Sequence, residues 1–222
     1  MNLLRKPFAG FQVFALAAII VMAVNHAIGL VGMNIQKVHT VFERLASSNL
    51  LLSFLLVIIF HTPVNRNLLL FCVFSFTVGM VAEIAGINTG YPFGSYCYTP
   101  TFGPQVFGVP VIIGVNWILL SYVSGVAVND RLQGDWQKIL AASVLMVAID
   151  LLLESFAIRH HFWMWRDKVP PLQNYISWFI ISIVIQLGFR KLIPASVNRS
   201  AIAYLVILFV FLIADSLLAL GT

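Results

Sequence analysis

Seven long apolar runs occupy most of this sequence, and they restrict its possible folds more than any other feature does. A helix needs roughly 20 apolar residues to cross the hydrocarbon core of a bilayer. We predict spans at residues 8–33, 40–60, 68–87, 109–128, 136–158, 174–189 and 201–220. Only 9% of the residues are charged, whereas a soluble domain has about 25%. The sequence therefore predicts an all-α, polytopic membrane bundle of about seven transmembrane helices.

The segments between these runs are short, which leaves no room for a separate soluble domain. We therefore interpret residues 1–222 as a single integral membrane domain. The net charge of +5 does not indicate nucleic-acid binding, because the basic residues are scattered at the ends of the runs. With a cytoplasmic N-terminus, eight Lys and Arg residues lie on the inner side and five on the outer side. This positive-inside bias predicts a multi-pass protein of the cell (inner) membrane with its N-terminus in the cytoplasm.

The polar residues inside the spans are predicted to meet at one end of the bundle. The first, third, fifth and seventh spans cross the membrane in the same direction, and each has polar residues late in its sequence. These residues are His26, Glu83, Asp150, Glu154 and Asp215. The two unusual inter-helix segments, 88–108 and 159–173, close that same end. The other end has only plain charged turns, so one half of the membrane is predicted to contain a specialised site.

The stretch 83–117 is the least ordinary part of the chain. Its segment 88–108 has no formal charge but is rich in Gly, Pro and aromatic residues. Glycine permits positive φ and close backbone approach, and proline stiffens turns. An interfacial aromatic belt would explain some of the aromatic residues, but not their concentration at one end. We interpret the stretch as a rigid, π-rich roof over a lipophilic pocket, which would suit a polyene or isoprenoid and would stabilise a cation.

Three carboxylates beneath this roof are the strongest candidates for chemistry. Asp150 and Glu154 lie four residues apart and so share one face of a helix, and Glu83 adjoins the roof. An acidic side chain within a membrane is costly and usually faces the interior of the bundle. Two structural alternatives remain open for Asp150 and Glu154. Either one could pair with Arg159 or His160, or they could lie near the interface where water reaches them.

Other polar residues support narrower conclusions. Asp215 is close enough to the end of the last span to be simply hydrated, and His26 is more typical of a hydrogen-bonded packing residue. No two of the five histidines have the spacing that puts them on one helix face, so no metal site is predicted. A retinal-binding protein would need a lysine in its last span, which has none.

The residues around the carboxylates resemble a family of carotenoid-biosynthesis membrane proteins that includes the carotenoid 1′,2′-hydratases, also called bisanhydrobacterioruberin hydratases. The most specific block runs from Glu83 to Thr99 and reads E-I-A-G-I-N-T-G-Y-P-F-G-x-Y-x-Y-T. The later blocks are Phe102-Gly103, Gly108-Val109-Pro110, Asn116-Trp117, D-L-L-L-E at Asp150–Glu154, W-M-W at Trp163–Trp165, and Val169-Pro170 through Asn174 to Trp178. Ser155 and Lys168 stand where the family often has proline and glycine.

The resemblance implies that water is added across the terminal C1–C2 double bond of an acyclic carotenoid end group, of the lycopene or γ-carotene type, to give a tertiary alcohol. It implies carboxylate acid/base catalysis without a cofactor or metal. Asp150 or Glu154 is the expected acid, with Glu83 in the same catalytic cluster. The expected substrate-binding residues are Tyr91, Phe93, Tyr96, Tyr98, Asn116, Trp117, Trp163, Trp165, Asn174 and Trp178.

The expected partners are a carotenoid or other isoprenoid substrate, water and membrane lipid. A function of a different class also remains open, a carotenoid-binding or lipid-binding membrane protein without catalysis. Such a protein would tolerate acid-to-amide changes at Glu83, Asp150 and Glu154. A proton-coupled transporter would use the same acids, but it should open toward both sides of the membrane.

Overall fold

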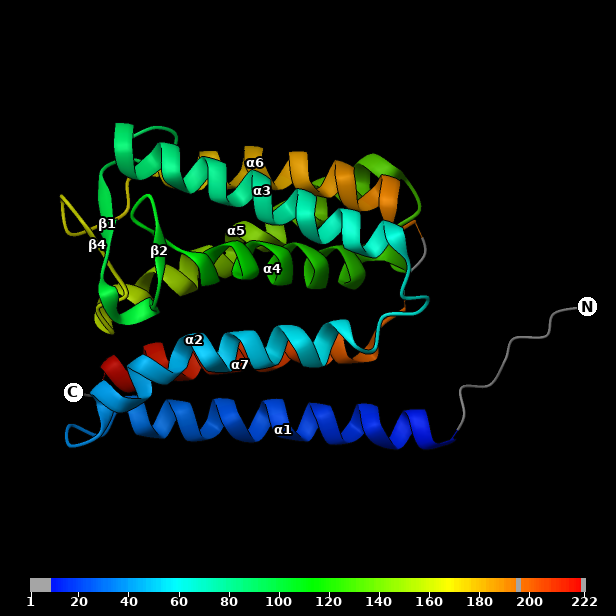
Figure 1. Cartoon of the computed structure of the whole chain (residues 1–222), viewed down its shortest axis with the longest axis horizontal. Coiled ribbons are helices and arrows are strands. Elements are labelled where there is room, and N and C mark those ends of the chain that lie inside the picture. The colour runs from blue at the N-terminus through cyan, green and yellow to red at the C-terminus, as the bar shows by residue number, and fades with distance from the viewer. Residues whose placement is uncertain (1–8, 195–196, 221–222) are drawn as a thin grey trace, which may run out of the picture.

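The computed structural model describes residues 9–194 and 197–220, and its seven helices confirm the predicted all-α bundle (Figure 1). The helices are α1 Ala9–Met33, α2 His39–Ile58, α3 Arg66–Thr89, α4 Val111–Asn129, α5 Asp135–Arg159, α6 Leu172–Leu192 and α7 Arg199–Leu220. Each contains a segment that is long and apolar enough to cross a membrane. The chain is therefore a multi-pass membrane protein, and each helix begins and ends within a few residues of a predicted span.

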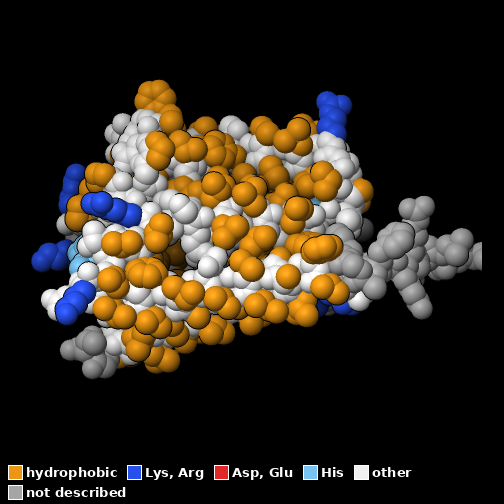
Figure 2. All heavy atoms as spheres, turned by 60° about the horizontal axis from the view of Figure 1, so that its bottom comes forward, with side chains coloured by type: hydrophobic (Ala, Val, Ile, Leu, Met, Phe, Trp, Pro, Cys, Tyr) orange, Lys and Arg blue, Asp and Glu red, His pale blue; other side chains and the backbone are white. Residues whose placement is uncertain are grey.

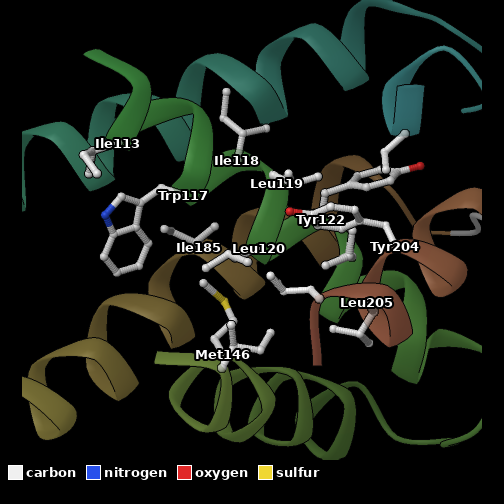
Figure 3. Packing of buried hydrophobic residues seen from close by; sticks show 14 of the residues in the cluster. Ile113, Trp117, Ile118, Leu119, Leu120, Tyr122, Met146, Ile185, Tyr204 and Leu205 are labelled. Atoms are coloured by element: carbon white, nitrogen blue, oxygen red, sulfur yellow. The ribbon is translucent and has the colours of Figure 1, made fainter. Parts of the chain in front are cut away.

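Helix α4 lies at the centre of the bundle, and most of its side chains are buried. It contacts α3 and α5 on its flanks, and also α2, α6 and α7. Figure 3 shows Trp117 and Leu120 of α4 near Met146 of α5 and Ile185 of α6. Lipid tails are as apolar as these side chains, so helix association in a membrane depends on close packing. Gly79 of α3 provides one such close approach, because a Cβ atom there would overlap the side chain of Trp117.

A small sheet closes one end of the bundle, which the hydropathy pattern does not predict. Strand β1 (Tyr96–Tyr98) pairs antiparallel with β4 (Trp163–Trp165), so that segments 88–108 and 159–173 are joined. Tyr96 lies opposite Trp165, and Tyr98 lies opposite Trp163. Because side chains alternate along a strand, these four aromatic residues share one face of the sheet. Figure 1 shows β1 and β4 together at the left end of the helices.

The rest of the roof is also ordered by short elements. A 3₁₀ helix, η1 (Pro100–Phe102), follows β1 and leads into a hairpin of β2 (Gln105–Val106) and β3 (Val109–Pro110). The two residues of the hairpin turn both have positive φ, 50° at Phe107 and 83° at Gly108, which is the geometry of a tight two-residue turn. The Ser47 hydroxyl of α2 donates to the Phe102 carbonyl at 2.9 Å. This contact ties the roof to the second helix.

An ionic cluster at the same end holds four segments together. Asp215 of α7 accepts hydrogen bonds from Arg159 at 2.7 Å, from His160 at 3.1 Å and from Asn34 at 3.2 Å. His160 also lies 3.7 Å from Glu43 of α2. The basic groups at the end of α5 therefore pair with Asp215 and Glu43. In the described residues they form no ion pair with Asp150 or Glu154.

The surface agrees with a membrane setting. Figure 2 shows a face covered largely by hydrophobic side chains, with Lys and Arg near its two ends. This face is also hollowed toward the left, which is the end that carries β1 and β4.

Candidate active site

Glu83 lies near the end of α3 and accepts three hydrogen bonds. Its Oε2 accepts from the Tyr96 hydroxyl at 2.5 Å and from the Tyr98 hydroxyl at 2.9 Å, and its Oε1 accepts from the Trp117 indole at 3.1 Å. The side chain is buried. These donors replace the water that a carboxylate loses on burial, so Glu83 is held in one orientation by the roof and by α4.

The two tyrosines are suited to act as permanent donors. Burial, and next the neighbouring Glu83 carboxylate, raise the pKa of Tyr96 and of Tyr98 well above the usual value near 10. Both phenols therefore keep their protons throughout the physiological pH range. The strand alternation Tyr-Cys-Tyr directs both rings to the same side of β1, which explains why one carboxylate oxygen receives both hydroxyls.

Glu154 of α5 has an arrangement of the same kind. Its Oε2 accepts from the Trp163 indole at 2.9 Å and from the Trp165 indole at 2.7 Å. Its Oε1 lies 3.5 Å from the side-chain amide nitrogen of Asn174. Strand β4 thus supplies two donors to Glu154, just as β1 supplies two donors to Glu83. The sheet as a whole provides four aromatic donors to two carboxylates.

Asp150 has different surroundings. Its Oδ2 accepts from the Asn174 amide at 2.9 Å. Its Oδ1 is buried and has no hydrogen-bond partner among the described residues. The side chain is 1% exposed, and a buried polar atom without a partner costs free energy unless a ligand or water satisfies it. Of the three carboxyls, Asp150 is therefore the one with a free oxygen for a proton or a ligand.

A small cavity of about 20 Å³ lies among these groups. All the predicted site residues except Tyr91 line it: Glu83, Phe93, Tyr96, Tyr98, Asn116, Trp117, Asp150, Glu154, Trp163, Trp165, Asn174 and Trp178. The apolar residues Ile113 and Leu153 also line it, and no motif in the sequence indicates them. A cavity needs roughly 10–15 Å³ to hold one water molecule, so this one has room for a single water.

Tyr91 lies outside this cluster, and its side chain is 73% exposed. Asp215 is also separate, because it is engaged in the ionic cluster with Arg159 and His160. His26 donates from Nδ1 to the Met22 carbonyl at 2.8 Å and packs edge-on against Phe211. It therefore has the packing environment that we expected from the sequence.

Aromatic rings form much of the cavity wall. Trp117 and Trp178 are stacked, with ring centroids 4.0 Å apart. Tyr96 and Trp165 lie 4.8 Å apart by the same measure. Aromatic faces attract positive charge, and here they lie beside three carboxyls. The site can therefore stabilise a carbon-centred cation and also hold the groups needed to give and accept protons.

The site lies within a region that matches known proteins. A family model described as "Carotenoid biosynthesis protein" matches residues 45–221. A curated relative, bisanhydrobacterioruberin hydratase of Haloarcula japonica, is 28% identical over 120 residues. That match covers 48% of this chain and 39% of the relative, which is less than half of the relative's length. No solved structure matches the chain significantly.

Proposed function

The chain belongs to the carotenoid biosynthesis protein family, and on this premise we propose that it adds water to the terminal C1–C2 double bond of an acyclic carotenoid end group. The observation that carries the proposal is the difference between the carboxyls. Glu83 and Glu154 each accept several hydrogen bonds, whereas Asp150 keeps one oxygen without a protein partner. Carboxyls in unlike surroundings can divide the roles of acid and base between them. The name of the hydratase relative supports the same class of reaction.

Asp150 is the proton donor in this mechanism. The π electrons of the C1–C2 bond take the proton from the Asp150 carboxyl, so that a C2–H bond forms and C1 becomes a tertiary cation. The oxygen of one water then bonds to C1. The proton released by that water passes to Glu154 or Glu83, and its return to Asp150 restores the site. One water is added, and the substrate is neither oxidised nor reduced.

Asn174 and the aromatic wall have positioning roles. The Asn174 amide donates to Asp150 and lies near Glu154, so it orients the side chains of these two carboxyls, which α5 holds one turn apart. The stacked pair Trp117 and Trp178 offers a π face to the cation at C1. Preorganised groups of this kind lower the barrier because they need little rearrangement when charge develops.

The size of the cavity supports the use of a single water. At about 20 Å³ it has room for one molecule, and the carboxylates beside it are placed to accept a proton from that water. Exclusion of further water protects the tertiary cation and strengthens its attraction to the carboxylates.

Incubation of the purified protein with lycopene tests this function. The wild-type protein should yield a product heavier by one water, and Asp150→Asn should yield none while it keeps the helical circular dichroism of the wild type. Lycopene that is bound by both proteins but recovered unchanged would overturn the hydratase and favour a carotenoid-binding protein. Equal hydration by both proteins would overturn the role of Asp150.

We infer that the site lies at the outer, non-cytoplasmic side of the cell (inner) membrane. In this orientation the end opposite the sheet carries the inner basic residues, among them Arg66, Lys138, Arg190 and Lys191. The positive-inside bias supports a cytoplasmic position for that end. Helix α1 begins at that same end (Figure 1), which supports a cytoplasmic N-terminus, although residues 1–8 lie outside the described part of the chain.

A further inference from the structure

A second and much larger cavity adjoins the candidate active site. Its volume is about 350 Å³, and helices α1, α2, α4, α5 and α7 contribute to its wall. The lining is mostly apolar, with Phe42, Leu208 and Phe211 among its residues. Pockets for small molecules typically have about 300–1,000 Å³ and a largely hydrophobic wall. This cavity therefore has the size and lining of a site for an apolar ligand.

The two cavities meet at a shared wall. Ile113 and Asn116 of α4, Leu153 of α5 and Trp163 of β4 line both of them. Asp150 and Glu154, which line the small cavity, lie on the same helix as Leu153. Glu154 also accepts a hydrogen bond from Trp163, which lines both cavities. A molecule in the large cavity would thus have one end beside the carboxyl cluster.

The small cavity cannot by itself hold a carotenoid end group, since it has room for only one water. The substrate must therefore lie mainly elsewhere, with its double bond presented at the shared wall. Among the cavities that adjoin the cluster, the large one has an apolar lining and a volume within the range of small-molecule pockets.

We propose that the large cavity is the channel for the polyene body of the carotenoid, and that the substrate enters it sideways from the lipid between α1 and α2. This inference rests on the proposed function, because it takes the carotenoid as the substrate. Ile28 of α1 and Leu45 of α2 line the cavity and are each about half exposed, 52% and 51%. These residues lie within apolar spanning helices, so the side of the cavity on which they are exposed faces hydrocarbon.

The family match gives no information about the part of the channel wall that α1 forms. That match begins at residue 45 and therefore leaves α1 outside it. The channel wall includes Gly29 of α1, and a Cβ atom built there meets nothing within 4 Å. The Cβ atom of a large side chain at position 29 would therefore meet no clash. Such a side chain can extend into the channel and block the channel directly.

The test compares Gly29→Phe with Ala27→Phe. Ala27 lies two residues away on the same helix, is exposed, and does not line the cavity. The wild-type protein and Ala27→Phe should retain lycopene equally on purification. Gly29→Phe should bind it more weakly by roughly tenfold or more, the loss typical when a side chain removes space from a hydrophobic pocket. Ala46→Phe on α2, which narrows the facing wall, should have the same effect.

Binding and turnover together separate the channel from the reaction. Lycopene absorbance that co-purifies with the protein measures the channel, and the hydrated product measures the reaction. If Gly29→Phe folds normally and both binds and hydrates lycopene like the wild type, the channel proposal is overturned and the hydratase proposal stands. Loss of binding in Gly29→Phe, with no product from any protein, would overturn the hydratase and leave the channel intact. Unchanged lycopene binding with loss only of co-purifying phospholipid would show that the cavity holds lipid tails, which also overturns the channel.

Discussion

Tyr96 and Trp165 lie opposite each other in the β1–β4 sheet, and each donates a hydrogen bond to a different buried carboxylate. Tyr96 donates to Glu83 on α3, and Trp165 donates to Glu154 on α5. Their rings are in contact, with centroids 4.8 Å apart. The sheet therefore sets the separation of two carboxylates that come from different helices. In the proposed mechanism these two carboxylates, Glu83 and Glu154, are the candidate bases that act with Asp150.

Removal of the Tyr96 hydroxyl tests the importance of this arrangement. Tyr96→Phe keeps the ring contact with Trp165 but removes one donor from Glu83. We expect kcat for hydration to fall by up to roughly 100-fold, because one preorganised donor is typically worth about 100- to 1,000-fold and two donors to Glu83 remain. Steady-state product formation measures the change. Tyr91→Phe is the matched control, since Tyr91 is largely exposed, and equal rates in the two variants would contradict the prediction.

Replacement of Glu154 by Gln should separate the reaction from the fold. The indoles of Trp163 and Trp165 can only donate, so the amide oxygen of the new side chain must take the place of Oε2. This orientation keeps both hydrogen bonds and removes the charge. We expect a thermal midpoint near that of the wild type, retained lycopene binding, and a loss of kcat of about 100- to 10,000-fold, the usual contribution of a general base. A variant with wild-type turnover would assign the base role to Glu83 instead.

The helices and their directions could be predicted because hydropathy in a membrane protein is a strong signal. The parity of the spans placed Glu83, Asp150 and Glu154 at one end, and the structure brings these three residues around one cavity. Their catalytic roles remain predictions. The exposure of Tyr91 could not be foreseen, because spacing within a motif does not decide which side of a turn faces the cavity.

Hydropathy does not reveal the β1–β4 sheet, because strands of three residues give little pattern. One signal was present: Tyr-Cys-Tyr at 96–98 and Trp-Met-Trp at 163–165 both alternate large aromatic and other residues, which is the period of a strand. Their pairing links segments more than 60 residues apart, and no local rule predicts such a partner. The large cavity depends on the order in which α1, α2 and α7 pack, which hydropathy does not specify.

The ionic cluster at the end of α5 should contribute to stability and not to chemistry. Arg159→Met leaves the buried Asp215 without its closest cation, although His160 and Asn34 still donate to it. Breaking a buried ion pair typically costs about 3–5 kcal/mol, and we expect the low end because Arg159 is partly exposed. Thermal unfolding in detergent measures the loss. Hydration below the melting temperature should stay near the wild-type rate, since Arg159 does not line the small cavity.

Two further variants complete this test. The double variant Arg159→Met, Asp215→Asn should recover part of the lost stability, because it removes the unpaired charge. Arg166→Met is the control, as its exposed side chain has no ion pair among the described residues. A melting temperature for Arg159→Met equal to that of Arg166→Met would show that the cluster contributes nothing.

The side of the membrane that the site faces can be measured with a natural cysteine. Cys97 is exposed and lies on β1, on the face of the sheet opposite to the tyrosines, whereas Cys72 is half-buried within the spanning helix α3. If the N-terminus is cytoplasmic, a membrane-impermeant maleimide should label Cys97 in intact spheroplasts. Cys97→Ser should abolish that labelling, which controls for Cys72. Labelling that requires lysis of the cells would place the sheet and the carboxyl cluster on the cytoplasmic side and reverse the proposed orientation.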